Sequence, residues 1–181
     1  MLPQLVALSL SIAVLGAIWA FLALGPLAAF VLVWAGFIAW GCFFHTGGDQ
    51  KALIKTICGN VYGVIIGWIA LLLVVKIGGG VLIVNAIIVG VTVFFLVIVA
   101  KIDQLSAVPA NVYGYAAIVA YSLHEKGVPS ATPDMVGTGP LENLTSPSIN
   151  NPLVKLIISM VIGAIAGYVS GMAAGALTKK A

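Results

Sequence analysis

The sequence predicts an all-α polytopic membrane protein with six transmembrane helices, in which the second trio repeats the first as a 3+3 inverted-topology repeat. Three observations predict this fold: an apolar composition, six apolar segments close to membrane-spanning length, and a copy of the third segment in the sixth. Of the 181 residues, 62% are hydrophobic and 7% are charged, which leaves too little polar surface to cover a water-soluble globule. We therefore expect residues 1–181 to form a single transmembrane domain in a lipid bilayer.

Six apolar segments provide the expected helices, since about twenty apolar residues are needed to cross the hydrocarbon core. They comprise residues 4–24, 27–44, 53–76, 81–100, 107–123 and 152–177. Glycine, proline or polar residues separate the first five segments. Such residues end helices where the backbone can reach water. Pro109 and Asn111 interrupt the fifth segment.

The loops set the expected orientation. Residues 125–151 are rich in Pro, Gly, Ser, Thr and Asn, so we expect an extramembrane loop there, with a solvated linker favoured over a segment that folds over a pore mouth. With a cytoplasmic N-terminus, the lysines on the cytoplasmic side are Lys51, Lys55, Lys101, Lys179 and Lys180. Those on the other side are Lys76, Lys126 and Lys155. The excess favours both termini in the cytoplasm.

The duplication is clearest between residues 51–70 and 151–170, which align without a gap. The identical pairs, each 100 positions apart, begin at Leu53, Lys55, Ile57, Val61, Gly63, Ile65 and Gly67. Apolar composition alone would give roughly two identities. An odd number of helices in each copy makes the second copy enter the bilayer from the opposite side. We expect repeat 1 over about 1–77 and repeat 2 over about 78–181, a plan typical of channels and transporters.

Weaker correspondences extend the repeat to the other helices. Four residues of the first segment recur 74 positions later in the fourth, namely Leu8, Gly16, Phe21 and Leu22. For the second and fifth segments we pair His45 with His124 and Pro26 with Pro109.

Glycines recur every fourth residue in the third and sixth segments. They are Gly59, Gly63 and Gly67, then Gly163, Gly167, Gly171 and Gly175. Such a stripe lets two helix backbones approach closely. We expect these glycines to pack the third helix against the sixth at the pseudo-twofold axis, with a contact between copies of the chain as the alternative.

Polar side chains inside the expected helices are candidates for a solute pathway. The tetrapeptide Asn-Val-Tyr-Gly occurs twice and contributes Asn60, Tyr62, Asn111 and Tyr113, while Asn85 lies in the fourth segment. An unpaired amide inside hydrocarbon is costly, so each must meet a helix, a carbonyl, water or a solute. Packing between helices is the alternative to solute contact. The two tetrapeptides do not correspond under the repeat, so we treat their likeness as independent or accidental.

Basic side chains mark both expected mouths of this pathway. His45 and His124 end equivalent segments, and Lys55 and Lys155 are matched in the repeat. Histidine and lysine at both mouths would admit neutral or anionic solutes and repel cations. Capping or extension of these side chains to the headgroups is the structural alternative.

Several function classes are disfavoured. The chain has no arginine and its eight lysines mark the ends of spans, which argues against nucleic-acid binding. No nucleophile with a base, cluster of metal ligands or phosphate-binding glycine loop is evident, so we expect no enzymatic activity, metal or cofactor. Cys42 and Cys58 lack the spacing of a metal site. Asp49 and Asp103 lie near segment ends, which argues against a proton-coupled carrier built on a buried carboxylate.

The segment HTGGDQKALIKTICGNVYG, residues 45–63, within a six-span chain of this size, resembles a family of small bacterial inner-membrane proteins catalogued only as a domain of unknown function. The resemblance implies six helices in a bacterial cytoplasmic membrane and assigns no substrate. The three-plus-three layout is also similar to that of the aquaporins, the urea-transporter halves and the acetate-uptake proteins. The Asn-Pro-Ala signature of the aquaporins is absent, which argues against a water channel.

We therefore expect a membrane channel or channel-like facilitator for a small neutral or weakly acidic solute. The solute classes are a urea-like amide, a short carboxylic acid or an ammonia-sized molecule. The alternative is a non-transporting membrane scaffold or assembly subunit whose glycines only pack helices. Small channel proteins often form symmetric oligomers, and a homo-oligomer such as a trimer is an option that the sequence leaves open.

Overall fold

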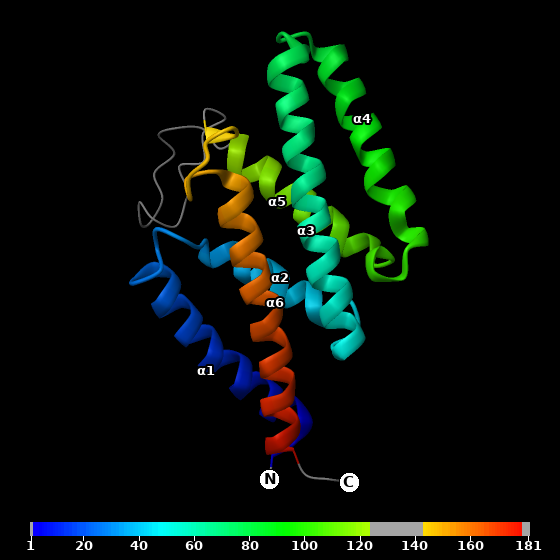
Figure 1. Ribbon diagram of the computed structural model, residues 1–181. Coiled ribbons are helices and arrows are strands. Elements are labelled where there is room, and N and C mark those ends of the chain that lie inside the picture. The colour runs from blue at the N-terminus through cyan, green and yellow to red at the C-terminus, as the bar shows by residue number, and fades with distance from the viewer. Residues whose placement is uncertain (1, 124–142, 179–181) are drawn as a thin grey trace.

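The computed structural model describes residues 2–123 and 143–178, and its regular elements there are helices (Figure 1). They are α1 (Gln4–Leu24), α2 (Val33–His45), α3 (Gln50–Leu73), α4 (Leu82–Ile98), α5 (Val108–Leu123) and α6 (Pro152–Leu177). A π-helical turn, η1 (Val74–Gly78), extends α3, and two 3₁₀ turns, η2 (Val99–Lys101) and η3 (Asp103–Leu105), follow α4. His124 and most of the expected loop lie outside the described residues.

Side-chain caps start α3 and α6. The Asp49 carboxylate accepts a hydrogen bond of 2.7 Å from the Ala52 N–H ahead of α3. Ahead of α6, the Asn151 side chain accepts one of 3.0 Å from Leu153 N–H. Each cap satisfies a backbone donor that has no partner within its helix. At the far end of α3, Gly79 and Gly80 adopt positive φ angles of 54° and 77°, and this left-handed turn reverses the chain into α4.

Four helices of the described chain are long and apolar enough to cross a membrane, where the sequence predicted six. They are Gln4–Leu24, Gln50–Gly78, Leu82–Lys101 and Pro152–Leu177. α2 has 13 residues and α5 has 16, so at 1.5 Å per residue they are about 20 and 24 Å long. Both are shorter than the hydrocarbon core, which is about 30 Å thick.

The second helix starts later than predicted because the chain turns after Pro26. Residues 25–30 form a turn, in which Leu27 N–H donates to Leu22 O at 2.9 Å. The apolar residues 27–30 are compatible with either a helix or a buried turn, so composition could not place this boundary.

Each long inner helix packs mainly on a short helix from the other half of the chain. α3 makes its largest contact with α5, and α6 makes its largest contact with α2. α1 lies beside α6, and α4 lies beside α3. In Figure 1, α3 and α6 run in opposite directions, and α2 and α5 pass behind them.

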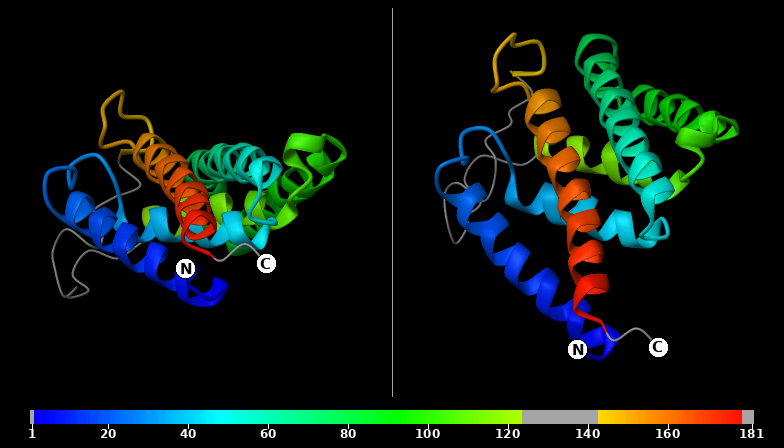
Figure 2. Two further views of the ribbon diagram at one scale, coloured as in Figure 1. Left: turned by 90° about the horizontal axis from the view of Figure 1, so that it is seen from below. Right: turned by 60° about the horizontal axis from the view of Figure 1, so that its bottom comes forward.

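The two ends of the described chain lie together. Leu2 N–H donates to Leu177 O at 3.0 Å, and Leu2 pairs with Thr178 in an isolated bridge. The start of α1 therefore meets the end of α6, as both views in Figure 2 show. At the opposite end of the molecule, Gly78, Gly79 and Gly80 join the end of α3 to the start of α4 (Figure 1).

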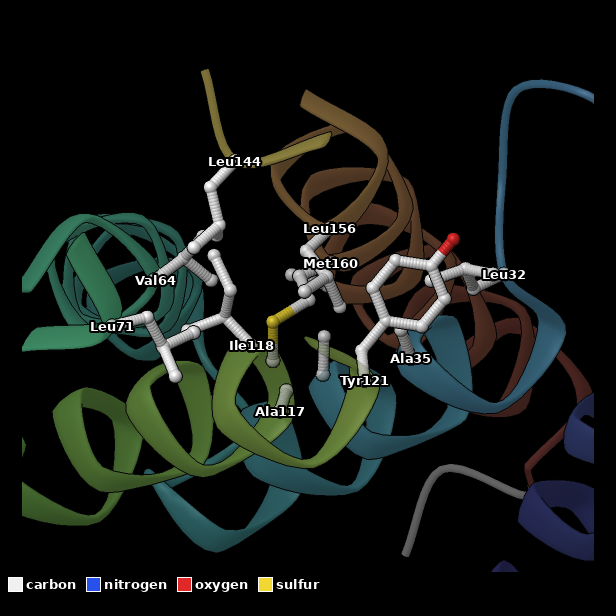
Figure 3. Packing of buried hydrophobic residues seen from close by; sticks show 12 residues of the cluster. Leu32, Ala35, Val64, Leu71, Ala117, Ile118, Tyr121, Leu144, Leu156 and Met160 are labelled. Atoms are coloured by element: carbon white, nitrogen blue, oxygen red, sulfur yellow. The ribbon is translucent and has the colours of Figure 1, made fainter. Parts of the chain in front are cut away.

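The main core lies where α2, α3, α5 and α6 meet. Figure 3 shows Val64 and Leu71 of α3 facing Ile118 of α5, with Leu156 and Met160 of α6 above them. In contrast, α1 and α4 leave large apolar side chains uncovered, and Leu82 and Phe21 are 82% and 73% exposed. Apolar outer helices around a packed centre are what a lipid environment favours.

The glycine stripes join different helices from those predicted. A Cβ atom on Gly63 would overlap the carbonyl oxygen of Asn111 in α5, and one on Gly163 would overlap the carbonyl oxygen of Gly36 in α2. Gly59 and Gly67 also face α5, and Gly167 and Gly171 face Phe43 of α2. A Cβ atom on Gly175 would meet no described group of another helix within 4 Å. A stripe of small residues predicts a close approach of two backbones, but it does not identify the partner helix.

Candidate functional site

A small cavity lies where the end of α2, the first turns of α3 and the start of α5 come together. Its volume is about 270 Å³, and it is lined by His45, Thr46, Lys55, Ser106, Ala107 and Pro109. These side chains come from segments that are up to 64 positions apart in the sequence. The cavity combines a lysine, a histidine and two hydroxyl groups with the apolar surfaces of an alanine and a proline.

His45 is held at this cavity by a partner from α5. Its Nδ1 atom lies 3.0 Å from the hydroxyl oxygen of Tyr113. The neighbouring Thr46 hydroxyl donates to the carbonyl oxygen of Cys42 at 2.8 Å, which closes the last turn of α2. The structure thus brings together two residues, His45 and Tyr113, that the sequence analysis selected separately.

Lys55 supplies the positive charge of the cavity. Its Nζ atom lies 3.0 Å from Oδ1 of Asp103, and the two side chains are 26% and 80% exposed. Ser106 holds the turn around Asp103, because its hydroxyl donates to the Asp103 carbonyl oxygen at 2.7 Å. The ammonium therefore lies in the cavity, while its carboxylate partner lies mostly in solvent.

Buried polar side chains also occur in α3 and α5, the helices that carry Lys55 and Pro109 of the cavity. Asn111 is fully buried, and its amide nitrogen donates to Leu96 O at 3.2 Å and to Leu105 O at 3.0 Å. The Asn111 side-chain oxygen has no hydrogen-bond partner among the described residues. Asn60 is 1% exposed, and both polar atoms of its side chain lack a partner there, as does the hydroxyl of the buried Thr56. We call Thr56, Asn60 and Asn111 the buried polar row.

The two Asn-Val-Tyr-Gly tetrapeptides pack against one another. Gly63, which ends the first copy, lies against the carbonyl oxygen of Asn111, which starts the second. Gly114, which ends the second copy, lies against the carbonyl oxygen of Asn60, which starts the first. Each glycine thus provides the space for the other copy's asparagine backbone, a contact that was not predicted from the sequence.

Other residues predicted to line a pathway lie elsewhere. The Tyr62 hydroxyl donates to Phe95 O at 2.9 Å and so attaches α4 to α3. Asn85 lies at the far end of the α3–α4 pair, with its buried side-chain oxygen against Gly78. Lys155 lies in the first turn of α6, where its carbonyl oxygen accepts a hydrogen bond from Ser159.

Two residues at the cavity were not predicted from the sequence. Asp103 was expected near a segment end but not in contact with Lys55, because the two are 48 positions apart and no local pattern links them. The other is Ser106, which lies in the turn between η3 and α5. A polar turn between two apolar helices was the one available signal for both residues.

The apolar helices and the packed polar centre define a multi-pass membrane protein of the all-helical class. The chain belongs to the family described as "Protein of unknown function (DUF1097)", whose model matches residues 9–175. The match confirms the resemblance predicted from residues 45–63. Comparisons with curated proteins and with solved structures found no significant match.

Proposed function

We propose that this protein is a channel or channel-like facilitator of the bacterial cytoplasmic membrane for a small neutral or weakly acidic solute. The observation that carries the proposal is the polar cavity at His45 and Lys55, which is followed by the buried polar row along α3 and α5. Polar groups at membrane depth are costly and usually mark a pathway for a solute or ion. A urea-like amide, a short carboxylic acid or an ammonia-sized molecule would find hydrogen-bonding groups in this row.

Passive conduction suits the placement of the charges better than coupled transport. Asp49 and Asp103 are the acids of the described residues; the first caps α3 and the second is 80% exposed. Neither lies deep between helices, where a proton-coupled carrier would need a carboxylate.

The burial pattern of α3 and α6 supports the inverted repeat that we propose for this channel. Along 52–70, every residue has the same degree of exposure as its counterpart along 152–170, except the pair 54 and 154. The neighbours follow the same plan, since α3 packs on α5 and α6 packs on α2. α2 and α5 would be the middle helices of each trio, and their short length would be tolerated because other helices cover them.

The glycine contacts favour a different alignment of α2 with α5 from the one predicted. Gly63 and Gly163 meet Asn111 and Gly36, which are 75 positions apart. Gly67 and Gly167 meet Ile118 and Phe43, which are also 75 positions apart. This offset is close to the offset of 74 positions that aligns α1 with α4. We propose it in place of the alignment that paired His45 with His124.

The contact between Leu2 and Leu177 supports placing both termini on one side of the membrane. With the lysine distribution, we propose that this side is the cytoplasm. Fusion reporters at the two ends test the orientation. Opposite signals from the two ends would contradict it.

The proposed function is tested by solute flux into proteoliposomes that contain the full chain. Urea, propionate and ammonia represent the three solute classes, and protein-free liposomes give the background. We expect Asn60→Leu to lower flux at least fivefold, while Ser9→Ala leaves it unchanged, because Ser9 is exposed and bonds only to Leu5 O of its own helix. Thermal unfolding of each variant in detergent shows whether it is folded. Background flux for all three solutes would reject the proposal and favour a membrane scaffold.

A further inference from the structure

Lys55 already pairs with a carboxylate of the chain, which lies at the edge of the cavity and mostly in solvent. Asp103 Oδ1 lies 3.0 Å from Lys55 Nζ, within hydrogen-bonding distance. An ammonium group has three donor hydrogens, so this contact leaves two for other partners. Because Asp103 is 80% exposed and Lys55 only 26%, the carboxylate can move into solvent at little cost, whereas the lysine stays in the cavity.

The remaining hydrogen-bonding capacity of the cavity favours an anion. The hydroxyl hydrogens of Thr46 and Ser106 are used by the carbonyl oxygens of Cys42 and Asp103. Lys55 keeps donors for a solute, and the second ring nitrogen of His45, whose Nδ1 lies beside Tyr113, donates or accepts according to the tautomer. Lys55 is the one charged side chain among the six lining residues, and its partner Asp103 lies mostly in solvent, so an ammonium-like cation would be repelled once Asp103 has left.

The size and walls of the cavity limit the anion to a short one. A water molecule occupies about 30 Å³ in the liquid, so 270 Å³ accommodates a few carbon atoms together with a carboxylate and some water. Ala107 and Pro109 provide an apolar wall for a short alkyl chain. Neither residue adds a charged group that would select a dicarboxylate.

We propose that Lys55 binds the carboxylate of a short monocarboxylic acid, of about two to four carbons, in competition with Asp103. This inference rests on the proposed function and specifies its solute class. Asp103 acts as an internal competitor: it occupies Lys55 when no acid is present and leaves when an acid enters. Removing Asp103 and removing Lys55 should therefore have opposite effects on the same solute.

Propionate uptake into proteoliposomes at pH 8 tests this opposition, since almost all of the acid is ionised there. Asp103→Asn should lower the half-saturating propionate concentration about two- to fivefold, the range expected for loss of an exposed ion pair. Lys55→Gln should raise it at least tenfold. Lys51→Gln is the matched control, because it removes an exposed lysine from the same helix and should leave propionate uptake unchanged.

A binding measurement separates this inference from the proposed function. Propionate should raise the thermal unfolding temperature of the detergent-solubilised wild type and of Asp103→Asn, because a ligand that binds the folded state stabilises it. It should not do so for a folded Lys55→Gln. If urea is transported but propionate neither binds nor is transported, the inference is overturned and the proposed function stands. Binding of propionate without flux of any solute would overturn the proposed function alone. Equal responses of both variants to propionate would overturn the inference.

Discussion

Gly63 of α3 lies directly against the backbone carbonyl of Asn111 in α5, and no side chain would fit between them. The reciprocal contact of Gly114 with the Asn60 carbonyl brings the same two helices together one turn away. At this crossing the two Asn-Val-Tyr-Gly segments form a tight contact of backbones, and their asparagine side chains belong to the buried polar row. Close backbone packing and buried polar side chains therefore coincide at this crossing.

The first prediction concerns this crossing. Gly63→Ala and Gly114→Ala should each destabilise the fold by about 1–3 kcal/mol or more, because the added Cβ overlaps a backbone oxygen that cannot move alone. Gly90→Ala is the control, since nothing lies within 4 Å of its Cβ position and alanine favours a helix by up to about 1 kcal/mol. Thermal unfolding in detergent measures all three. Equal stability of Gly63→Ala and Gly90→Ala would contradict the close contact.

A second prediction concerns the contact between α2 and α6. Trp40 Nε1 donates to the hydroxyl oxygen of Ser170 at 3.1 Å in a buried position. A double-mutant cycle of Trp40→Phe and Ser170→Ala should give a coupling energy of about 0.6 kcal/mol, the average for hydrogen bonds between membrane helices. Reversible unfolding in mixed detergent measures it. Strictly additive losses would mean that the two side chains do not interact.

The third prediction concerns the ends of the chain. The substitutions Leu2→Cys and Thr178→Cys are made in a chain that also carries Cys42→Ala and Cys58→Ala. The two new cysteines should form a disulfide under mild oxidation, because residues 2 and 178 are paired in an isolated bridge and so meet the distance requirement. Leu2→Cys with Val81→Cys is the control, since Val81 lies at the opposite end of the molecule (Figure 1). A shift in electrophoretic mobility that a reductant reverses reports the bond. Cross-linking of the control pair instead would refute this arrangement.

The fourth prediction separates stability from function at the cavity. Asp103→Asn should cost less than about 1 kcal/mol, because exposed ion pairs contribute little. For a chain of this size that is a shift in the unfolding temperature of at most about 2–4 °C. Salt at 0.5 M should remove the difference between wild type and variant. A shift of 10 °C would show that Asp103 holds the fold together.

The long helices were predictable because their signal is carried by length and hydropathy. Segments 4–24 and 152–177 match α1 and α6 at both ends. The start of α2 was not predictable, because the turn after Pro26 is built from residues as apolar as those of a helix. The glycine stripes predicted close backbone contact but not the partner helix, which is α5 for the stripe of α3 and α2 for that of α6.

The candidate site could be predicted only in part. His45 and Lys55 were selected because the predicted repeat pairs them with His124 and Lys155. The partners that complete the cavity come from a turn that lies about fifty positions later, and only the packing of α5 on α3 brings that turn to Lys55. The packing role of the repeated tetrapeptide was not predicted from the sequence. Its two copies join α3 to α5, whereas the predicted duplication pairs α3 with α6.

The hydrogen bond between Leu2 and Leu177 makes the chain nearly a closed ring. A short linker between residues 178 and 2 would complete that ring, and a new opening at Gly79 and Gly80 would leave all six helices uncut. In such a circular permutant, α4 would come first and α3 last, so the order of the two trios along the chain would be exchanged without moving any helix. The architecture thus depends on which helices touch and not on where the polypeptide starts.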